Sequence, residues 1–198
     1  MIIRLANKND CSEVARIHFQ EIKWGFLSEL GEKFLYYFYQ AMIGSESAFL
    51  IVAENNESII GFVSGCANLK KFYKEFVKKY SFKIPFILLT KIFDLNVIKK
   101  VFETIKYSKK EEQNLPQAEL LSIAVSSEFQ GQGVSQKLLE KFLFEMRKRN
   151  IDRFKVIVGE NLIRAVRFYE KKGFEFHSKS FVHQDMPSRI YIFNIKNQ

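Results

Sequence analysis

Residues 119–135 read ELLSIAVSSEFQGQGVS. The first seven of them, Glu119 to Val125, have the apolar composition of a strand that is buried in a sheet. Gly131 and Gly133 follow, and apolar residues at helical spacing then continue from Val134 to Lys148. This order predicts a strand, a glycine-containing loop and the N-terminus of a helix.

The predicted loop has the chemistry of a phosphate-binding site. Glycines at 131 and 133 remove side chains, so that successive backbone N–H groups can converge on an anion. The helix that follows adds unsatisfied N–H donors and a favourable dipole, which together suit a pyrophosphate. Glycines alone are equally compatible with an ordinary tight turn, and the loop has neither the Walker sequence nor the GxGxxG spacing.

Composition patterns predict the other elements of the N-terminal half. Asp10 followed by Glu13 resembles a capping box that opens a helix, and a second helix spans roughly 31–43 with Gly44 as its C-cap. Strands are predicted at 2–6, 48–54 and 58–67, the last two joined as a hairpin by a turn at 54–57.

The C-terminal half reads as alternating strands and helices. We predict a strand at 154–158, a short helix at 162–172 stopped by Gly173, and an antiparallel pair at 174–181 and 189–195. These elements predict an α/β fold with a mixed, mostly antiparallel central sheet and helices on both faces, formed by a single domain over residues 1–198. Such sheets bind ligands beyond the carboxyl ends of strands, where the strand ending at Val125 delivers its loop.

Composition excludes several classes of protein. With 47% hydrophobic and 27% charged residues, the chain is an ordinary globular protein, and its apolar stretches are too short to cross a bilayer. The N-terminal residues lack the apolar core of a secretory signal, so we expect a cytoplasmic protein. We expect Cys11 and Cys66 to be free thiols, and no metal site, since His18, His177 and His183 lie on separate elements.

The positive charge is concentrated in one segment. The formal charge is +9, and residues 70–110 contain twelve lysines, no arginine and three acidic residues, so the rest of the chain is neutral. Aromatic residues interleave with these lysines and predict basic amphipathic helices. The lysines are either a solvated face over an aromatic core, or a surface that attracts an anionic substrate, an acidic membrane or nucleic acid. The absence of arginine disfavours nucleic acid.

Two motifs resemble the GNAT superfamily of acetyl-coenzyme A dependent N-acetyltransferases. Its Q/R-x-x-G-x-G/A motif is matched by residues 130–135, except that Ser135 stands where Gly or Ala is usual. Its A-x-x-F-Y-E-K-x-G-F signature is matched by residues 165–174. The resemblance is firm over residues 117–176 and looser over 1–67. It leaves residues 68–113 unexplained, as a helical insertion between the third and fourth strands.

The resemblance implies a cofactor site and two catalytic residues. Acetyl-coenzyme A is the implied cosubstrate, with no metal. Tyr169 is implied as the general acid for the coenzyme A sulfur, and Glu119 as a general base, either directly or through a water chain. Asn161 precedes Tyr169 by eight residues where seven is usual, so it is either a cofactor contact or a helix N-cap. The remaining implied cofactor-binding residues are Ile123, Val125, Gln130, Gly131, Gln132, Gly133, Val134, Ser135 and Phe168.

The implied function is transfer of an acetyl group to a primary amine of a small molecule, such as an amino sugar or an amino acid derivative. If the basic insertion lines the cleft, the acceptor is expected to be anionic. The alternatives are a noncatalytic acyl-coenzyme A sensor with this fold, or a basic protein that binds membrane surfaces or nucleic acid. We expect no nucleic-acid partner and no membrane span, and the sequence is compatible with a monomer or a homodimer.

Overall fold

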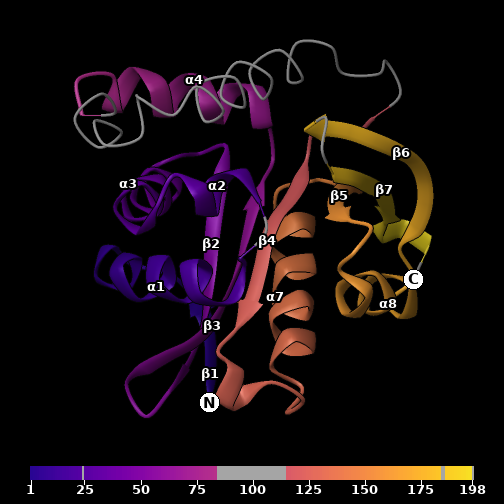
Figure 1. The fold of residues 1–198 in the computed structure, drawn as a ribbon, viewed down its shortest axis with the longest axis horizontal. Coiled ribbons are helices and arrows are strands. Elements are labelled where there is room, and N and C mark those ends of the chain that lie inside the picture. Colours follow the sequence, from indigo (N-terminus) through magenta and orange to yellow (C-terminus); the bar gives the residue numbers. More distant parts are fainter. Residues whose placement is uncertain (24, 84–114, 184–185, 198) are drawn as a thin grey trace.

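The computed structural model describes residues 1–23, 25–83, 115–183 and 186–197. These residues form a seven-stranded sheet in the order β1-β2-β3-β4-β5-β7-β6 (Figure 1). Only β4 and β5 pair in parallel, and every other neighbouring pair is antiparallel, which confirms the predicted mixed sheet. The strands are β1 (Ile2–Leu5), β2 (Ala48–Asn55), β3 (Ser58–Cys66), β4 (Glu119–Val125), β5 (Arg153–Gly159), β6 (Glu175–His183) and β7 (Met186–Asn194).

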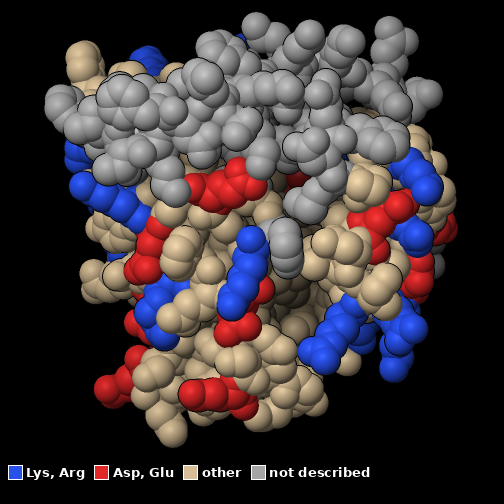
Figure 2. Space-filling view, viewed as in Figure 1, with Lys and Arg blue, Asp and Glu red and all other residues tan. Residues whose placement is uncertain are grey.

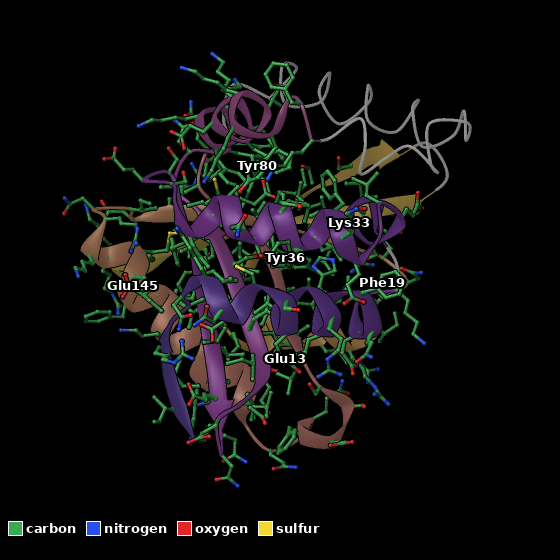
Figure 3. All side chains as sticks on the ribbon, turned by 90° about the vertical axis from the view of Figure 1, so that its left-hand side faces the viewer. Glu13, Phe19, Lys33, Tyr36, Tyr80 and Glu145 are labelled. Carbon is green, nitrogen blue, oxygen red and sulfur yellow. The ribbon has the colours of Figure 1, made fainter. Side chains whose placement is uncertain are left out.

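Helices cover both faces of the sheet, as predicted. One face carries α1 (Cys11–Glu21), α2 (Phe26–Glu29), α3 (Glu32–Ile43) and α4 (Leu69–Tyr80), which form the first hydrophobic core. Figure 3 shows α1 and α3 side by side across this face, with α4 beyond α3. The other face carries α7 (Val134–Lys148) and α8 (Ile163–Lys171), which form the second core with the strands.

The helix α4 lies between β3 and β4, where the insertion is predicted. Phe72, Phe76 and Tyr80 are buried, and the ring centroid of Phe72 lies 5.4 Å from that of Phe38 on α3. The lysines of α4 are exposed on the opposite side, namely Lys70, Lys71, Lys74, Lys78 and Lys79. Within α4 the lysines therefore form a solvated face over an aromatic core, whereas residues 84–110 of the basic segment lie outside the described residues.

The predicted capping box at Asp10 and Glu13 is wrong. The capping box is formed by Asn7 and Asp10 around a short 3₁₀ turn, Lys8–Asp10, that precedes α1. Asp10 is engaged elsewhere, because its carboxylate accepts hydrogen bonds from the backbone N–H of Asn7 at 2.7 Å and from the guanidinium of Arg4. It therefore does not cap α1 with its side chain.

Two smaller predictions are confirmed. The turn between β2 and β3 has positive φ at Asn56 and Glu57, as a tight hairpin requires. Cys11 and Cys66 are both buried free thiols. Among the helices that the structure describes, none has the length and apolar character that a membrane crossing demands.

Candidate active site

A β-bulge in β4 opens the sheet. Ser122 lies opposite Ser64 of β3, whereas the next pair is Leu120 opposite Gly65, so Leu121 is an extra residue without a partner. On its other side, β4 pairs with β5 only at Glu119–Lys155 and Leu120–Val156. A bulge bends its strand and ends regular pairing. The two parallel strands therefore separate immediately after the bulge.

A cleft of about 1440 Å³ lies at this separation. Its floor is formed by residues 121–125 of β4 and 156–159 of β5. One wall belongs to the first core and includes Ile22, Leu27 and Tyr73, whereas the other belongs to the second core and includes Ala165, Phe168 and Tyr169. The cleft thus reaches both faces of the sheet, and Figure 2 shows this side of the molecule hollowed, with acidic and basic side chains around the opening.

The glycine loop is shaped to accept a ligand. Gly131 and Gly133 have φ values of 77° and 78°, which favour glycine, and a Cβ added at either position would meet no atom of the described structure within 4 Å. Gly133 is the N-cap of the 15-residue helix α7, and no side chain of the described residues caps it. The first N–H groups of α7 are thus available to an anion, so the residues present fit a phosphate-bearing cofactor.

Gln130 holds the start of this loop rather than projecting freely. Its Nε2 donates hydrogen bonds to the backbone oxygen of Val125 at 3.0 Å and to the Glu21 carboxylate at 3.1 Å. The other oxygen of Glu21 accepts the backbone N–H of Ser127 at 2.9 Å. The end of α1 is therefore tied to the loop across the cleft.

The cleft brings together most of the predicted site residues. Glu119, Ile123, Val125, Gln130, Gly131, Ser135, Asn161, Phe168 and Tyr169 all line it. Three predicted residues do not line it, and their side chains explain why. Val134 is buried in the second core, Gln132 donates to the backbone oxygen of Glu128 at 3.0 Å, and Gly133 has no side chain. Any role of these three in ligand binding falls to their backbone groups.

Tyr169 is held rigidly by the second core. Its ring centroid lies 5.0 Å from that of Phe174 and 5.5 Å from that of Phe168, and the residue is only 4% exposed. Burial raises the pKa of its phenol, which stays protonated through the neutral range. Tyr169 thus presents a neutral hydroxyl donor to the cleft.

Glu119 lies at the far end of β4 from the loop, next to a buried cation. Its Oε2 is 3.8 Å from the Nζ of Lys155, which is fully buried on β5 and donates to the Pro116 oxygen at 2.9 Å. The ion pair compensates the burial of both charges. Six residues of strand separate Glu119 from Val125, which corresponds to about 20 Å.

Asn161 lines the cleft but does not cap α8. The N-cap of α8 is Leu162, and no side chain of the described residues caps this helix. The N-cap alternative for Asn161 is therefore wrong. Instead the side chain of Asn161 packs closely against Gly159 of β5. A Cβ atom at position 159 would lie only 2.9 Å from Oδ1 of Asn161, so this approach requires a glycine there.

Sequence reasoning missed the wall formed by the N-terminal half. His18 and Glu21 of α1 and Tyr73 of α4 line the cleft, although no motif singles them out. Their positions on the sheet-facing sides of amphipathic helices would be the only signal, and it does not separate core from cleft. Within the described ranges, no cluster of three or more His, Cys, Asp or Glu side chains could hold a metal ion.

Comparisons with known proteins agree with this geometry. The family model described as Acetyltransferase (GNAT) family matches residues 16–174. No curated protein sequence matches the chain.

Solved structures show a similar fold at low sequence identity. The ribosomal-protein-S18-alanine N-acetyltransferase from Escherichia coli is 16% identical with a TM-score of 0.62, covering 98% of this chain and 93% of its own. An N-acetyltransferase from Staphylococcus aureus Mu50 is 12% identical with a TM-score of 0.62, covering 98% of both chains. The yncA protein of Salmonella typhimurium, solved with its cofactor acetyl-CoA, is 15% identical with a TM-score of 0.63, covering 98% and 94%.

Proposed function

The chain belongs to the acetyltransferase (GNAT) family, and from that premise we propose that it transfers the acetyl group of acetyl-coenzyme A to a primary amine of a small molecule. Enzymes of this family are acetyl-coenzyme A dependent acyltransferases.

One observation carries the proposal: a single cleft joins the glycine loop, Tyr169 and Glu119. Acetylation of an amine needs a bound acyl donor, a donor group for the leaving thiolate and a route for the ammonium proton. The loop, the phenol and the carboxylate offer these three functions in that order. The cleft that joins them opens where the pairing of β4 with β5 ends, after Leu120.

The cofactor end of the cleft is the loop and the start of α7. Backbone N–H groups of Gly131, Gln132, Gly133, Val134 and Ser135 bind the diphosphate, aided by the dipole of α7. Beyond the bulge, the backbone of Ile123 on the edge facing β5 has no strand partner there, so it is available to hydrogen-bond an extended ligand arm. Phe168 and Asn161 contribute the wall on the α8 side.

Acetyl-coenzyme A supplies a thioester carbonyl and a thiolate leaving group when it is bound. Tyr169 donates its phenolic proton toward the sulfur and thereby stabilises the leaving group. Glu119 takes the proton of the acceptor ammonium, directly or through water, because only the neutral amine is nucleophilic. Lys155 holds the carboxylate of Glu119 at the acceptor end of the cleft.

The acceptor binds on the side of the cleft formed by α1, α2 and α4. Ligand pockets of about 300–1,000 Å³ enclose one drug-sized molecule, so a cleft of about 1440 Å³ has room for a cosubstrate and a small acceptor. An amino sugar or an amino acid derivative fits this space. The anionic acceptor expected from the basic segment gains no support from α4, whose lysines lie on its exposed side.

A thiol-release assay tests the proposal. The purified protein is incubated with acetyl-coenzyme A and a panel of amino sugars, amino acids, amino acid amides and simple amines, and free thiol is measured over time. Amine-dependent thiol release, with the acetylated amine detected by mass spectrometry, is the expected result. Binding of acetyl-coenzyme A without turnover of any amine would instead favour the noncatalytic sensor.

A further inference from the structure

His18 is a buried polar side chain of the cleft that the proposed mechanism does not use. It lies on α1, is 2% exposed and still lines the cleft. Its ring stacks on Phe62 of β3, with an interplanar angle of 16° and a centroid distance of 5.9 Å. Burial and stacking hold the imidazole in one orientation, so a ligand in the cleft meets the same edge of the ring each time.

One nitrogen of His18 is occupied by the protein. Its Nδ1 is hydrogen-bonded to the hydroxyl of Tyr39 on α3, which is also fully buried. Its Nε2, on the opposite edge of the ring, has no partner among the residues that the structure describes. Because the ring lines the cleft and its Nδ1 edge is turned to Tyr39, the Nε2 edge is the part that reaches the cleft.

The hydroxyl of Tyr39 determines which nitrogen of His18 carries the proton. Burial raises the pKa of the Tyr39 phenol, so the phenol keeps its single proton at neutral pH. Nδ1 of His18 is the hydrogen-bond partner of this hydroxyl, whereas the Ser64 hydroxyl nearby on β3 donates to the backbone oxygen of Ser122. A buried hydroxyl donates its proton to the acceptor within reach, so Tyr39 donates to Nδ1, and the proton of a neutral imidazole then resides on Nε2.

His18 is also uncharged at neutral pH. Burial lowers its pKa to about 4, and no carboxylate of the described residues forms an ion pair with it. The hydrogen bond from Tyr39 to Nδ1 therefore leaves His18 with a neutral N–H on the edge of its ring that reaches the cleft. A neutral N–H of this kind can donate a hydrogen bond to an oxygen atom that carries no negative charge.

We propose that the Nε2–H of His18 binds an uncharged oxygen of the acceptor, a carbonyl or a hydroxyl close to the reacting amine. The inference rests on the proposed function and specifies its acceptor class. Glu21 is three residues further on α1, on the same helix face as His18, so a carboxylate or phosphate placed there would meet a negative charge. Lys23 and Arg164 also line the cleft, but both are exposed to water, which screens their charge, so they offset that repulsion only weakly.

Matched amines measure the contribution of His18. The oxygen of L-alaninamide or D-glucosamine lowers the basicity of its amine, so kcat/KM is calculated on the concentration of neutral amine. On that basis we expect L-alaninamide or D-glucosamine to be turned over with a kcat/KM about tenfold higher than 2-aminopropane or cyclohexylamine, respectively, the size of one well-formed hydrogen bond. His18→Phe, which keeps an aromatic ring on Phe62, should remove this preference through KM and leave the two oxygen-free amines unchanged. The two pairs distinguish a carbonyl from a hydroxyl as the recognised oxygen.

Two further variants separate recognition from folding. His18→Gln places an amide N–H at a similar reach and should restore part of the preference that His18→Phe loses. His177→Gln, on the exposed part of β6, should change neither preference nor KM. A preference that persists in His18→Phe, or a higher kcat/KM for L-alanine than for L-alaninamide, would overturn the inference.

The tautomer of His18 can be measured in the free protein, without any substrate. Nitrogen NMR of the free protein, with the His18 signals assigned by their loss in His18→Phe, should show a protonated Nε2 and an unprotonated Nδ1 at pH 7. Tyr39→Phe should weaken this single-tautomer signature. A protonated Nδ1 would overturn the inference alone, whereas the expected tautomer without turnover of any amine would overturn the proposed function and, with it, the acceptor class.

Discussion

Burial places the phenol of Tyr169 in a defined chemical state. Its raised pKa lies well above that of a free thiol, about 8.5. Complete transfer of its proton to a thiolate is therefore unfavourable, while a strong hydrogen bond to the developing negative charge is not. The structure thus favours a phenol that keeps its proton and donates a hydrogen bond to the sulfur as the thiolate departs.

Tyr169→Phe is predicted to lower turnover while coenzyme A affinity stays nearly constant, since only the hydroxyl is lost. The expected loss in kcat is ~10²–10⁴-fold, measured with chemistry as the rate-limiting step. Tyr80→Phe is the matched control, because its hydroxyl donates to Gln40 at 3.1 Å between α4 and α3 (Figure 3), and Tyr80 is not among the residues that line the cleft. Equal turnover in the two variants would reject the assigned role.

The buried His18 predicts how stability depends on pH. Its folded pKa of about 4 lies below the ordinary value of 6.5, so the unfolded chain binds more protons between these two values. Stability should fall as pH decreases from about 6.5 to about 4, by about 2 kcal/mol between pH 7 and pH 5.

Urea unfolding at these two pH values measures the effect. In His18→Gln the difference between pH 7 and pH 5 should shrink by most of that amount, because glutamine does not titrate. The carboxylates of Asp10 and Glu145 have lowered pKa values, through hydrogen bonds and ion pairs that outweigh burial, and lose their contribution only at more acidic pH. An unchanged pH dependence in the variant would show that His18 is not the group responsible.

At the scale of elements, the site depends on the junction of β4 and α7. The bulge at Leu121 separates β4 from β5, and the loop that follows ends in a helix whose first N–H groups have no side-chain cap. Each feature lowers the stability of the protein without a ligand, since unpaired strand edges and uncapped helix ends leave backbone N–H and C=O groups without hydrogen bonds. Their coincidence at one cleft is explained if a ligand satisfies them.

Gly133→Asp is predicted to abolish the rise in melting temperature that acetyl-coenzyme A produces by binding only the folded state. The substitution adds a side chain and a negative charge at the proposed diphosphate site, and it strains a backbone with φ of 78°. Gly31→Asp is a matched control, because Gly31 is also a helix N-cap with positive φ and open space, but lies outside the cleft.

Thermal shift at several acetyl-coenzyme A concentrations is the measurement for both variants. We expect each variant to be destabilised without ligand, and only Gly31→Asp to respond to the ligand like the original protein. A full response of Gly133→Asp would remove the loop from the cofactor site.

At the scale of the whole molecule, the lysines of α4 and the cleft are separated. The charge excess lies in residues 70–110, and α4, at the described start of that segment, turns Leu69 and Tyr73 to the cleft and its lysines to solvent. Exposed charges act on a ligand through water and are screened over about 8 Å at physiological ionic strength. The lysines of α4 are therefore expected to contribute little to acceptor binding.

Replacing Lys71, Lys74 and Lys78 together by Gln should leave the acceptor KM unchanged, whereas Tyr73→Leu should raise it several-fold. The reason is that Tyr73 is the one of these four residues that lines the cleft. Steady-state kinetics at low and at physiological salt measure both effects. A KM that rises in the triple variant and with ionic strength would restore the anionic acceptor that the sequence suggested.

Local sequence patterns predicted the elements of this fold well. The strand 119–125 and the helix 134–148 are found at their predicted residues, because apolar periodicity and glycine reflect short-range backbone preferences. The loop and Tyr169 are predicted site residues for a related reason, since a family motif consists of residues that are close in the sequence. Errors arose where a polar side chain had two possible partners, as at Asp10 and Asn161.

The cleft itself follows from contacts between residues far apart in the chain. No local pattern marks the bulge at Leu121, because it is a mismatch of register between β3 and β4. Nor does any pattern bring His18 to the cleft, since its place depends on Tyr39 and Phe62 from two other elements. Fold class and the glycine loop are thus predictable from the sequence, whereas the proposed acceptor wall exists only after folding, because long-range packing alone determines which faces of α1 and α4 border an opening.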